Sequence, residues 1–231
     1  SDVVIAADDN ASKYLVMPYL KDKAVAVVFC GLNWTAEPYG YPYRNATGMI
    51  EVGPVEPLQA EVKAVVKNVR RGVFLSVDEL SQHKEFAEVR KFYQRLDIEM
   101  TFTVARTMAE WEAGFTAAQT QADFLVIGNN AGIIGWDNDR ARRYVHAHGR
   151  RFVVAYHEWM APYAMLTMAK IPAEQGEWSG KVALLILNGT LPSKIPIVAN
   201  RRWNMFANLP LLEKAGFRLS PEILRKAVKV E

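Results

Sequence analysis

The chain has 231 residues, of which 50% are hydrophobic and 23% are charged, and its formal net charge is +3. This composition is typical of a globular protein and argues against a disordered chain. A small net charge without long Lys/Arg runs gives nucleic-acid binding little support, and no apolar window of about 20 residues predicts a membrane-spanning helix. The only cysteine, Cys30, lies in an apolar run and is expected to be a buried small hydrophobe.

The amino-terminal block predicts short strands joined by irregular segments. In chain order we expect a strand at 3–7, a short helix from about 11, a strand at 24–29, a loop at 35–47 and an extended segment at 48–52. Pro18 is expected to end the helix early. Gly53-Pro54 then breaks the pattern and is a candidate hinge. Because a self-supporting sheet normally needs three or more strands, we expect this block to be incomplete at its amino end.

The central block alternates strands and helices between about 72 and 156. The expected elements are helix 58–69, strand 73–77, helix 81–96, strand 99–105, helix 107–121, strand 124–127, helix 137–148 and strand 151–156. Ser81 and Asp137 are expected to cap their helices, and Thr107 with Glu110 forms a capping box. Such alternation indicates a parallel sheet with helices on both faces and right-handed crossovers.

The carboxy-terminal block begins after a second candidate hinge at Pro162. It predicts, in order, a short strand at 165–169, a helix from Pro172 to about 187, extended segments at 195–198 and 203–207, and helices at 209–215 and from about 221. The chain contains no internal repeat and no low-complexity tract. It therefore predicts two α/β lobes connected by crossing segments.

The stretch ADFLVIGNNAGIIGW, from Ala122 to Trp136, combines a buried strand, a small polar loop and the start of a helix. In parallel α/β sheets, small ligands bind beyond the carboxyl ends of the strands. Asn129 and Asn130 in this loop offer both donors and acceptors. The alternative is an ordinary βα turn, in which the asparagines serve only their own backbone.

Polar and aromatic residues follow the other expected strands in the same way. The strand ends are occupied by Asp8, Asp9, Asn10, Asn33 and Trp34 in the first block, and by Asp78, Glu79, Arg106, Asn129, Asn130, His157, Glu158 and Trp159 in the second. Amide, carboxylate and aromatic groups together suit a small polar ligand that is hydrogen-bonded and stacked on a ring. The alternatives are that the aspartates cap helices and that the two tryptophans pack in the core or at a hinge.

Enzymatic motifs are missing from the sequence, which has no GxSxG, P-loop, HExxH or GxGxxG pattern. Asp8 and Asp9 beside Asp78 could hold a metal, but no ligand spacing supports such a site. His157 and Glu158, as neighbours in a strand, would point to opposite faces. We therefore expect no catalysis, no metal and no cofactor, and a small-molecule enzyme is the least favoured alternative.

Several stretches together carry a resemblance to a known family. The matching stretches, in chain order, are DVVIAADDNASKYLVMPYLK, VFCGLNW, TGMIEV, ADFLVIGNNAGIIGWD, HEWMAPYAML, AEQGEWSGKVALLILNG and LPSKIPIVANRRWNMFAN. The chain resembles the ABC-transporter substrate-binding proteins of the tryptophan-binding-like family, which have type I periplasmic binding folds. The resemblance spreads over nearly the whole chain, and the set of stretches is more specific than any one of them.

The resemblance implies a two-lobe α/β protein with parallel sheets flanked by helices and a ligand cleft that closes on binding. The expected lobes are 1–52 with about 165–190, and 53–164 with about 191–231. Family members begin with a signal peptide and further βα units, which this sequence lacks, so we expect an incomplete first lobe. The ligand-binding residues carried over are Asp8, Asp9, Asn10, Asn33, Trp34, Asp78, Asn129, Asn130, His157 and Trp159.

The implied function is that of the solute-binding component of an ABC importer, which delivers a small polar molecule to a permease in the membrane. The expected location is periplasmic, or extracytoplasmic with a lipid anchor. The carboxylates of Asp8, Asp9, Asp78 and Glu158 suit an amine or several hydroxyls. Arg106 suits a carboxylate instead, and an amino-acid-like ligand, which satisfies both, is favoured. The alternative is a sensory ligand-binding domain of the same fold in a signalling system.

Overall fold

The computed structural model describes residues 2–230, and the chain within them separates into two units. The first unit comprises the chain up to Gly53 and the segment Lys170–Arg202. The second unit comprises Pro54–Ala169 and the chain from Trp203 onward. Ser1 and Glu231, the end points of the expected lobe ranges, lie outside the described residues.

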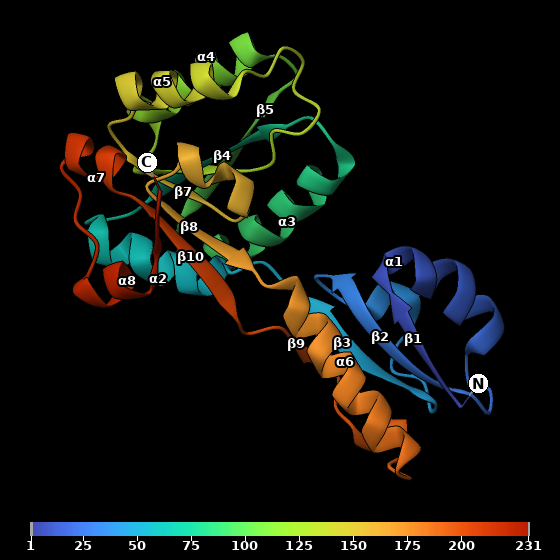
Figure 1. Cartoon of the computed structure of the whole chain (residues 1–231). Helices are drawn as coiled ribbons and strands as arrows, with labels where there is room; N and C mark the ends of the chain where they lie inside the picture. Colours follow the sequence, from blue (N-terminus) through green and yellow to red (C-terminus); the bar gives the residue numbers. More distant parts are fainter. Residues whose placement is uncertain (1, 231) are drawn as a thin grey trace. The chain divides into compact units, whose positions relative to one another are not determined.

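The first unit is built on a sheet that, within the described residues, has four strands in the order β1-β2-β3-β9. Its strands are β1 (Val3–Ala7), β2 (Ala26–Asn33), β3 (Ala46–Glu51) and β9 (Val198–Ala199), and each neighbouring pair is parallel. Its helical segments are α1 (Asp8–Ala11), η1 (Ser12–Leu20), η2 (Glu37–Tyr39), α6 (Pro172–Leu187) and η4 (Pro192–Lys194). Figure 1 shows α6, in orange, running beside the strands of this unit.

The core of the first unit is formed mainly by β2 and the aromatic residues that pack on it. Phe29 is fully buried, and its ring lies 4.2 Å from that of Tyr41, which in turn lies 4.5 Å from that of Tyr43. Cys30 on the same strand is 8% exposed, as the sequence predicts. Because β2 is buried on both faces, its sequence is a continuous apolar run and does not alternate between apolar and polar residues.

The helical segment after β1 continues past Pro18, where the sequence predicted an early stop. Residues Ser12–Leu20 are wound as a π-helix, and the N–H of Lys21 donates to the carbonyl of Val16, five residues earlier. A π-helix pairs residue i with i−5. Pro18 lies inside this segment, where it has no N–H to donate, and the chain nevertheless stays helical to Leu20.

The second unit contains a larger sheet, which within residues 2–230 has seven strands in the order β11-β10-β8-β7-β6-β4-β5. The strands are β4 (Arg71–Val77), β5 (Glu99–Ala105), β6 (Phe124–Ile127), β7 (Phe152–Ala155), β8 (Leu166–Lys170), β10 (Trp203–Asn208) and β11 (Val228–Val230). From β5 through β4, β6 and β7 to β8 the pairing is parallel. The predicted alternation of strands and helices is thus confirmed.

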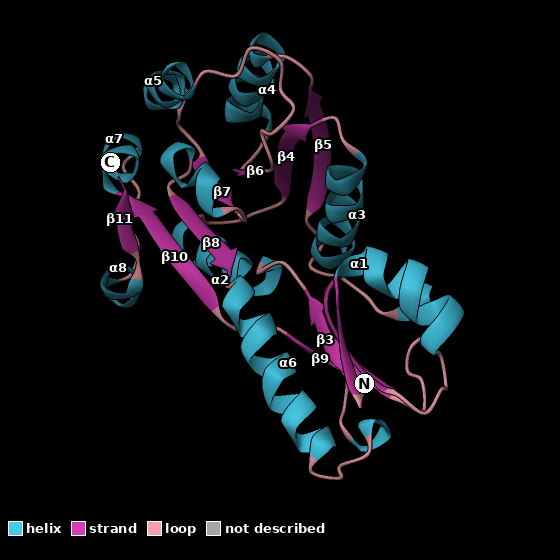
Figure 2. Cartoon of the chain, turned by 45° about the vertical axis from the view of Figure 1, so that its right-hand side comes forward, coloured by secondary structure: helices cyan, strands magenta, loops and turns pink. Residues whose placement is uncertain are grey.

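Helices cover both faces of this sheet. They are α2 (Val55–Val65), α3 (Leu80–Gln94), α4 (Met108–Gln121), α5 (Asn138–His148), η3 (Glu158–Tyr163), α7 (Leu209–Ala215) and α8 (Pro221–Lys226). Figures 1 and 2 show α4 and α5 together on one face and α2 and α3 on the other. Each residue of β6 and β7 is consequently buried, which accounts for their unbroken apolar sequences.

Two of the three predicted caps are present. Thr107 and Glu110 form the reciprocal capping box of α4, and the Asp137 side chain accepts from the N–H of Arg140 at the start of α5. Ser81 is not a cap, because α3 begins at Leu80 with Glu79 in the N-cap position. The backbone carbonyl of Glu79 accepts from the N–H groups of the residues three and four positions later, so the helix starts without a side-chain cap.

Two segments belong to the other unit from the one expected. Residues 191–202 were assigned to the second lobe but lie in the first unit, where β9 pairs with β3 and Thr47 Oγ1 donates to the carbonyl of Ile195 at 2.8 Å. Residues 165–169 were assigned to the first lobe but lie in the second unit, because β8 pairs with β7. Both corrections depend on pairing between residues distant in sequence, which a local pattern does not contain.

Three side chains fix the starts of strands by accepting hydrogen bonds from two consecutive backbone N–H groups each. Asp123 accepts from Arg70 and Arg71 at 2.8 and 2.8 Å, Gln119 from Arg150 and Arg151 at 2.7 and 2.8 Å, and Glu174 from Arg201 and Arg202 at 2.9 and 2.9 Å. We call these three side chains the strand-start clamps.

Among the helices described, none is both long enough and apolar enough to cross a bilayer.

Candidate functional site

The carboxyl ends of the parallel strands in the second unit bring five predicted residues to one edge of the sheet. We call Asp78, Asn129, Asn130, His157 and Trp159 the second rim. Asp78 follows β4, the asparagines follow β6, and His157 and Trp159 follow β7. Because β4, β6 and β7 are consecutive parallel neighbours, their ends lie side by side, as the sequence predicts for this edge.

An exposed indole ring is held in a fixed orientation on this rim. The ring of Trp159 stacks on that of His157, with centroids 4.6 Å apart and an interplanar angle of 15°. Its Nε1 donates to Asn129 Oδ1 at 3.3 Å, and the same oxygen accepts from the N–H of Ala131 at 2.9 Å. Trp159 nevertheless remains 55% exposed. The sequence-based alternative of core packing is therefore wrong for this tryptophan.

Beneath the indole lies a buried polar network that the sequence analysis missed. Ser76 Oγ donates to Gln82 Oε1 at 2.6 Å, and Gln82 Nε2 donates to Glu85 Oε2 at 2.9 Å. That carboxylate oxygen lies 3.3 Å from His157 Nε2. The sequence signal that could have revealed this network was the pair Gln82 and Glu85. These polar residues are spaced by three on the side of α3 that faces the sheet, where apolar residues are normal.

Asp78 is engaged by two basic side chains of its own unit. Its Oδ1 lies 2.8 Å from His83 Nε2, and its Oδ2 accepts from Arg106 Nη2 at 2.5 Å. The hydrogen bonds from His83 and Arg106 hold the pKa of the Asp78 carboxyl below its ordinary value of 3.8. Asp78 therefore joins the end of β4 to His83 on α3 and to Arg106 after β5. Its negative charge partly neutralises the positive charge of Arg106.

The pKa of Asp78 can be tested directly. We expect a carboxyl-carbon NMR titration to place it below 3.8, and His83→Ala or Arg106→Ala to raise it. The stabilisation linked to this depressed pKa is present above the unfolded-state value, near about 4, and is lost as the pH falls through the folded-state value. A midpoint at or above 3.8 in the unaltered chain would contradict the two hydrogen bonds.

The first unit gathers the other five predicted residues at the ends of β1 and β2. We call Asp8, Asp9, Asn10, Asn33 and Trp34 the first rim. Asp9 Oδ2 accepts from Asn33 Nδ2 at 2.7 Å, and its Oδ1 accepts from the Tyr39 hydroxyl at 2.5 Å. Burial and then this bond to Asp9 raise the pKa of Tyr39 above its ordinary value of 10.0.

The aspartates of the first rim do not cap a helix. Ala7 is the N-cap residue of α1, which has no side-chain cap bond. Asp8 instead adopts φ 77°, and its carboxylate accepts from the N–H of Asp9 at 2.6 Å and from Asn10 Nδ2 at 3.5 Å. Trp34 also has a positive φ, of 68°, and its N–H donates to the carbonyl of Glu51. Left-handed backbone at two non-glycine residues marks strained positions at this edge.

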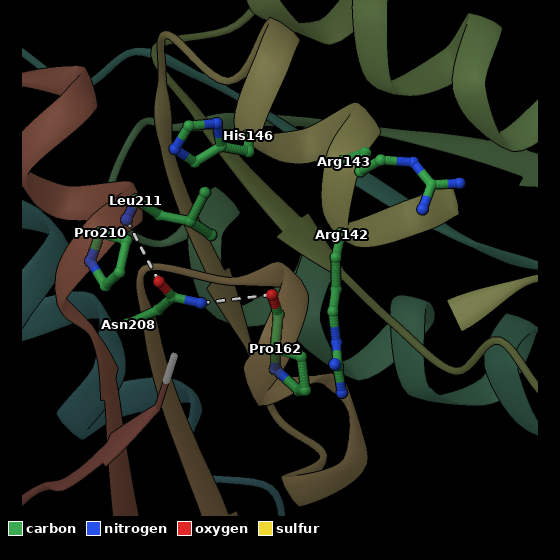
Figure 3. Close-up of a pocket in the computed structure, with 7 residues that line it drawn as sticks. All are labelled: Arg142, Arg143, His146, Pro162, Asn208, Pro210 and Leu211. Carbon is green, nitrogen blue, oxygen red and sulfur yellow. Dashed lines mark hydrogen bonds between the residues drawn. The ribbon is translucent and has the colours of Figure 1, made fainter. Parts of the chain in front are cut away.

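A groove lies elsewhere in the second unit, between α5, η3 and α7, and has a volume of about 320 Å³. Figure 3 shows its lining residues Arg142, Arg143, His146, Pro162, Asn208, Pro210 and Leu211. The buried amide of Asn208 donates to the carbonyl of Pro162 and accepts from the N–H of Leu211, so it joins η3 to α7. None of the lining residues belongs to either rim.

Within residues 2–230, no group of three or more His, Cys, Asp or Glu residues is placed to hold a metal ion.

The sequence matches no family model and no curated protein. Solved structures, however, are similar to this chain over 100% of its length. A ligand-free, open substrate-binding protein with adhesive properties from Clostridium difficile has a TM-score of 0.76 at 14% identity, with 78% of that chain covered. An ABC domain in complex with L-Trp from Streptococcus pneumonia has a TM-score of 0.61 at 16% identity, with 79% of that chain covered. A conserved domain protein from Vibrio cholerae has the same TM-score and identity, with 78% covered. At these identities, the likeness shows the fold.

Proposed function

We propose that this chain, which has the type I periplasmic-binding-protein fold, is the solute-binding component of an ABC importer and binds a small polar molecule without transforming it. It would act outside the cytoplasmic membrane and deliver its solute to a membrane permease. The similarity in fold to a substrate-binding protein and to a domain in complex with L-Trp supports this role. Fold alone admits other functions, so the site must carry the argument.

The observation that carries the proposal is the exposed, oriented ring of Trp159 on the second rim. An aromatic face contributes contact area at a low cost in side-chain entropy, and its orientation here is fixed by His157 and Asn129. In open parallel α/β sheets, small ligands bind beyond the carboxyl ends of the strands, which is where this ring lies. We propose that the solute presents a flat or apolar face to Trp159 and hydrogen-bonding groups to the amide of Asn130.

The charges at the strand ends favour an amino-acid-like solute. Arg106 at the end of β5, which Asp78 neutralises only in part, suits the carboxylate of such a solute. The engagement of Asp78 by His83 and Arg106 also supports binding over catalysis, because the lowered pKa of that carboxyl makes it a weaker base.

The proposal is tested by a thermal-shift panel of L-amino acids including L-tryptophan, nucleosides, monosaccharides and polyamines. We expect at least one compound to raise the melting temperature, since a ligand that binds only the folded state stabilises it. For that compound, Trp159→Ala should weaken affinity by about tenfold or more, where tenfold equals about 1.4 kcal/mol.

A matched control is Leu187→Ala on α6, because Leu187 is 56% exposed and Trp159 is 55% exposed. This variant removes a comparable exposed apolar side chain that belongs to neither rim, and its affinity should stay unchanged. A panel in which no compound shifts the melting temperature, or a ligand whose affinity is indifferent to Trp159→Ala, would refute the proposed site.

A further inference from the structure

The first two turns of α3 bury polar side chains against the sheet. Gln82 is 4% exposed and Glu85 is 9% exposed. Burying an amide and a carboxylate is costly unless both are hydrogen-bonded, so polar residues at such positions need specific partners. Their partners lie at the carboxyl ends of β4, β6 and β7, which is where the second rim begins.

Gln82 reaches the loop that carries Asn129. Its Oε1 accepts from Ser76 Oγ at 2.6 Å and from the backbone N–H of Asn129 at 2.9 Å. The residue before Asn129 is Gly128, and a Cβ on it would come within 2.6 Å of Gln82 Oε1. The glycine therefore leaves the space that the glutamine amide occupies.

Glu85 reaches the histidine on which the indole stacks. Its Oε2 accepts from Gln82 Nε2 at 2.9 Å and lies 3.3 Å from His157 Nε2. The imidazole of His157 thus has a carboxylate oxygen of Glu85 near its Nε2 and the indole of Trp159 stacked on its face. A continuous set of contacts runs from α3 to both groups that orient the indole.

We propose that Gln82 and Glu85 are positioning residues for solute recognition: from α3 they fix Asn129 and His157, and through them the orientation of Trp159. This inference rests on the proposed function, because it gives these residues a role only where the indole meets the solute. Groups fixed before binding lose less freedom on binding, so releasing them lowers affinity without removing a direct contact.

The experiment compares four variants of the full chain by NMR without any ligand, and a fifth variant assigns the indole signal. Gln82→Met keeps the length of the side chain but loses its polar atoms, and Glu85→Leu removes the carboxylate, whereas Glu85→Gln keeps an acceptor for Gln82. Val89→Ala is the matched control, because Val89 is fully buried on the same helix one turn further on. Trp159→Phe identifies the Trp159 indole signal among six tryptophans.

We expect Gln82→Met to speed amide exchange at Asn129, and Glu85→Leu to shift the Trp159 indole signal. Glu85→Gln should restore that signal in large part, and Val89→Ala should change neither readout although it also destabilises α3. Unchanged signals in Gln82→Met and Glu85→Leu would overturn the inference, as would equal changes in Val89→Ala.

A second arm measures affinity for the compound found in the thermal-shift panel. Gln82→Met should weaken it by about tenfold and Val89→Ala by less than about twofold. Loss of affinity in Trp159→Ala but not in Gln82→Met would overturn the positioning role and leave the proposed function standing. A panel without any binder would instead count against the proposed function. The NMR measurements made without ligand would still decide whether Gln82 and Glu85 fix Asn129 and the indole of Trp159.

Discussion

Gly128→Ala is expected to lower the free energy of unfolding by about 3 kcal/mol and to loosen the second rim. A Cβ at this position would lie 2.5 Å from Ser76 Oγ and 2.6 Å from Gln82 Oε1, distances that real Cβ atoms do not show. Inserting a methyl group into a packed site costs about 1–3 kcal/mol. Displacing the amide adds the cost of leaving buried polar groups unpaired, which is about 1–3 kcal/mol for each group.

Urea unfolding of Gly128→Ala and Gly176→Ala measures this effect with an internal comparison. Gly176 lies inside α6, and a Cβ there would meet no atom within 4 Å. Its replacement should raise stability by up to about 1 kcal/mol, because alanine is the better helix former. If both variants were as stable as the unaltered chain, the buried network around Gln82 would not have the geometry described.

Glu174→Ala is expected to cost about 3 kcal/mol, because it removes a strand-start clamp of the first unit. Its two carboxylate oxygens accept from the N–H groups of Arg201 and Arg202 at 2.9 and 2.9 Å, and the side chain is 9% exposed. A hydrogen bond to a charged group contributes about 1.5–3 kcal/mol, and alanine offers the two N–H groups no replacement. Glu174→Gln keeps one acceptor oxygen and should recover about half of the loss.

The control for this prediction lies one turn along the same helix. Glu177 pairs with Arg202 Nη1 at 2.7 Å, but its side chain is 51% exposed. Exposed ion pairs contribute about 0–1 kcal/mol, so Glu177→Ala should be nearly neutral in the same urea titration. Equal losses in the two variants would show that charge near Arg202, and not the backbone clamp, provides the stability.

Much of the second unit could be predicted from the sequence, because its elements carry local signals. The strands at 99–105 and 124–127 have the predicted bounds, and the capping box at Thr107 is present. Helix α2 instead begins three residues before its predicted start, with Pro57 in its first turn. A proline is tolerated there because the first N–H groups of a helix have no intrahelical partner.

The features that the sequence did not predict depend on distant partners. The extended segment predicted at 195–198 overlaps β9 only at Val198, and the two residues of β9 form a strand because β3 lies beside them. At the candidate site, the order of the parallel strands was enough to predict that Asn129, His157 and Trp159 share an edge. The stack of His157 on Trp159 was not predictable because it depends on the backbone geometry of η3, where a strand was expected. The polar face of α3 was not predictable because it requires side chains from separate elements to meet. That these residues bind a solute is the proposal made above.

The strand-start clamps also have a consequence for proteolysis. Each clamp holds the amides of two consecutive arginines, at Arg70-Arg71, Arg150-Arg151 and Arg201-Arg202. Trypsin cuts after arginine but needs several residues in an extended, unpaired form, so these dibasic bonds are cleaved only when the adjacent strand start opens. The relative cutting rates at the three sites therefore report how often each strand start opens while the rest of the chain stays folded.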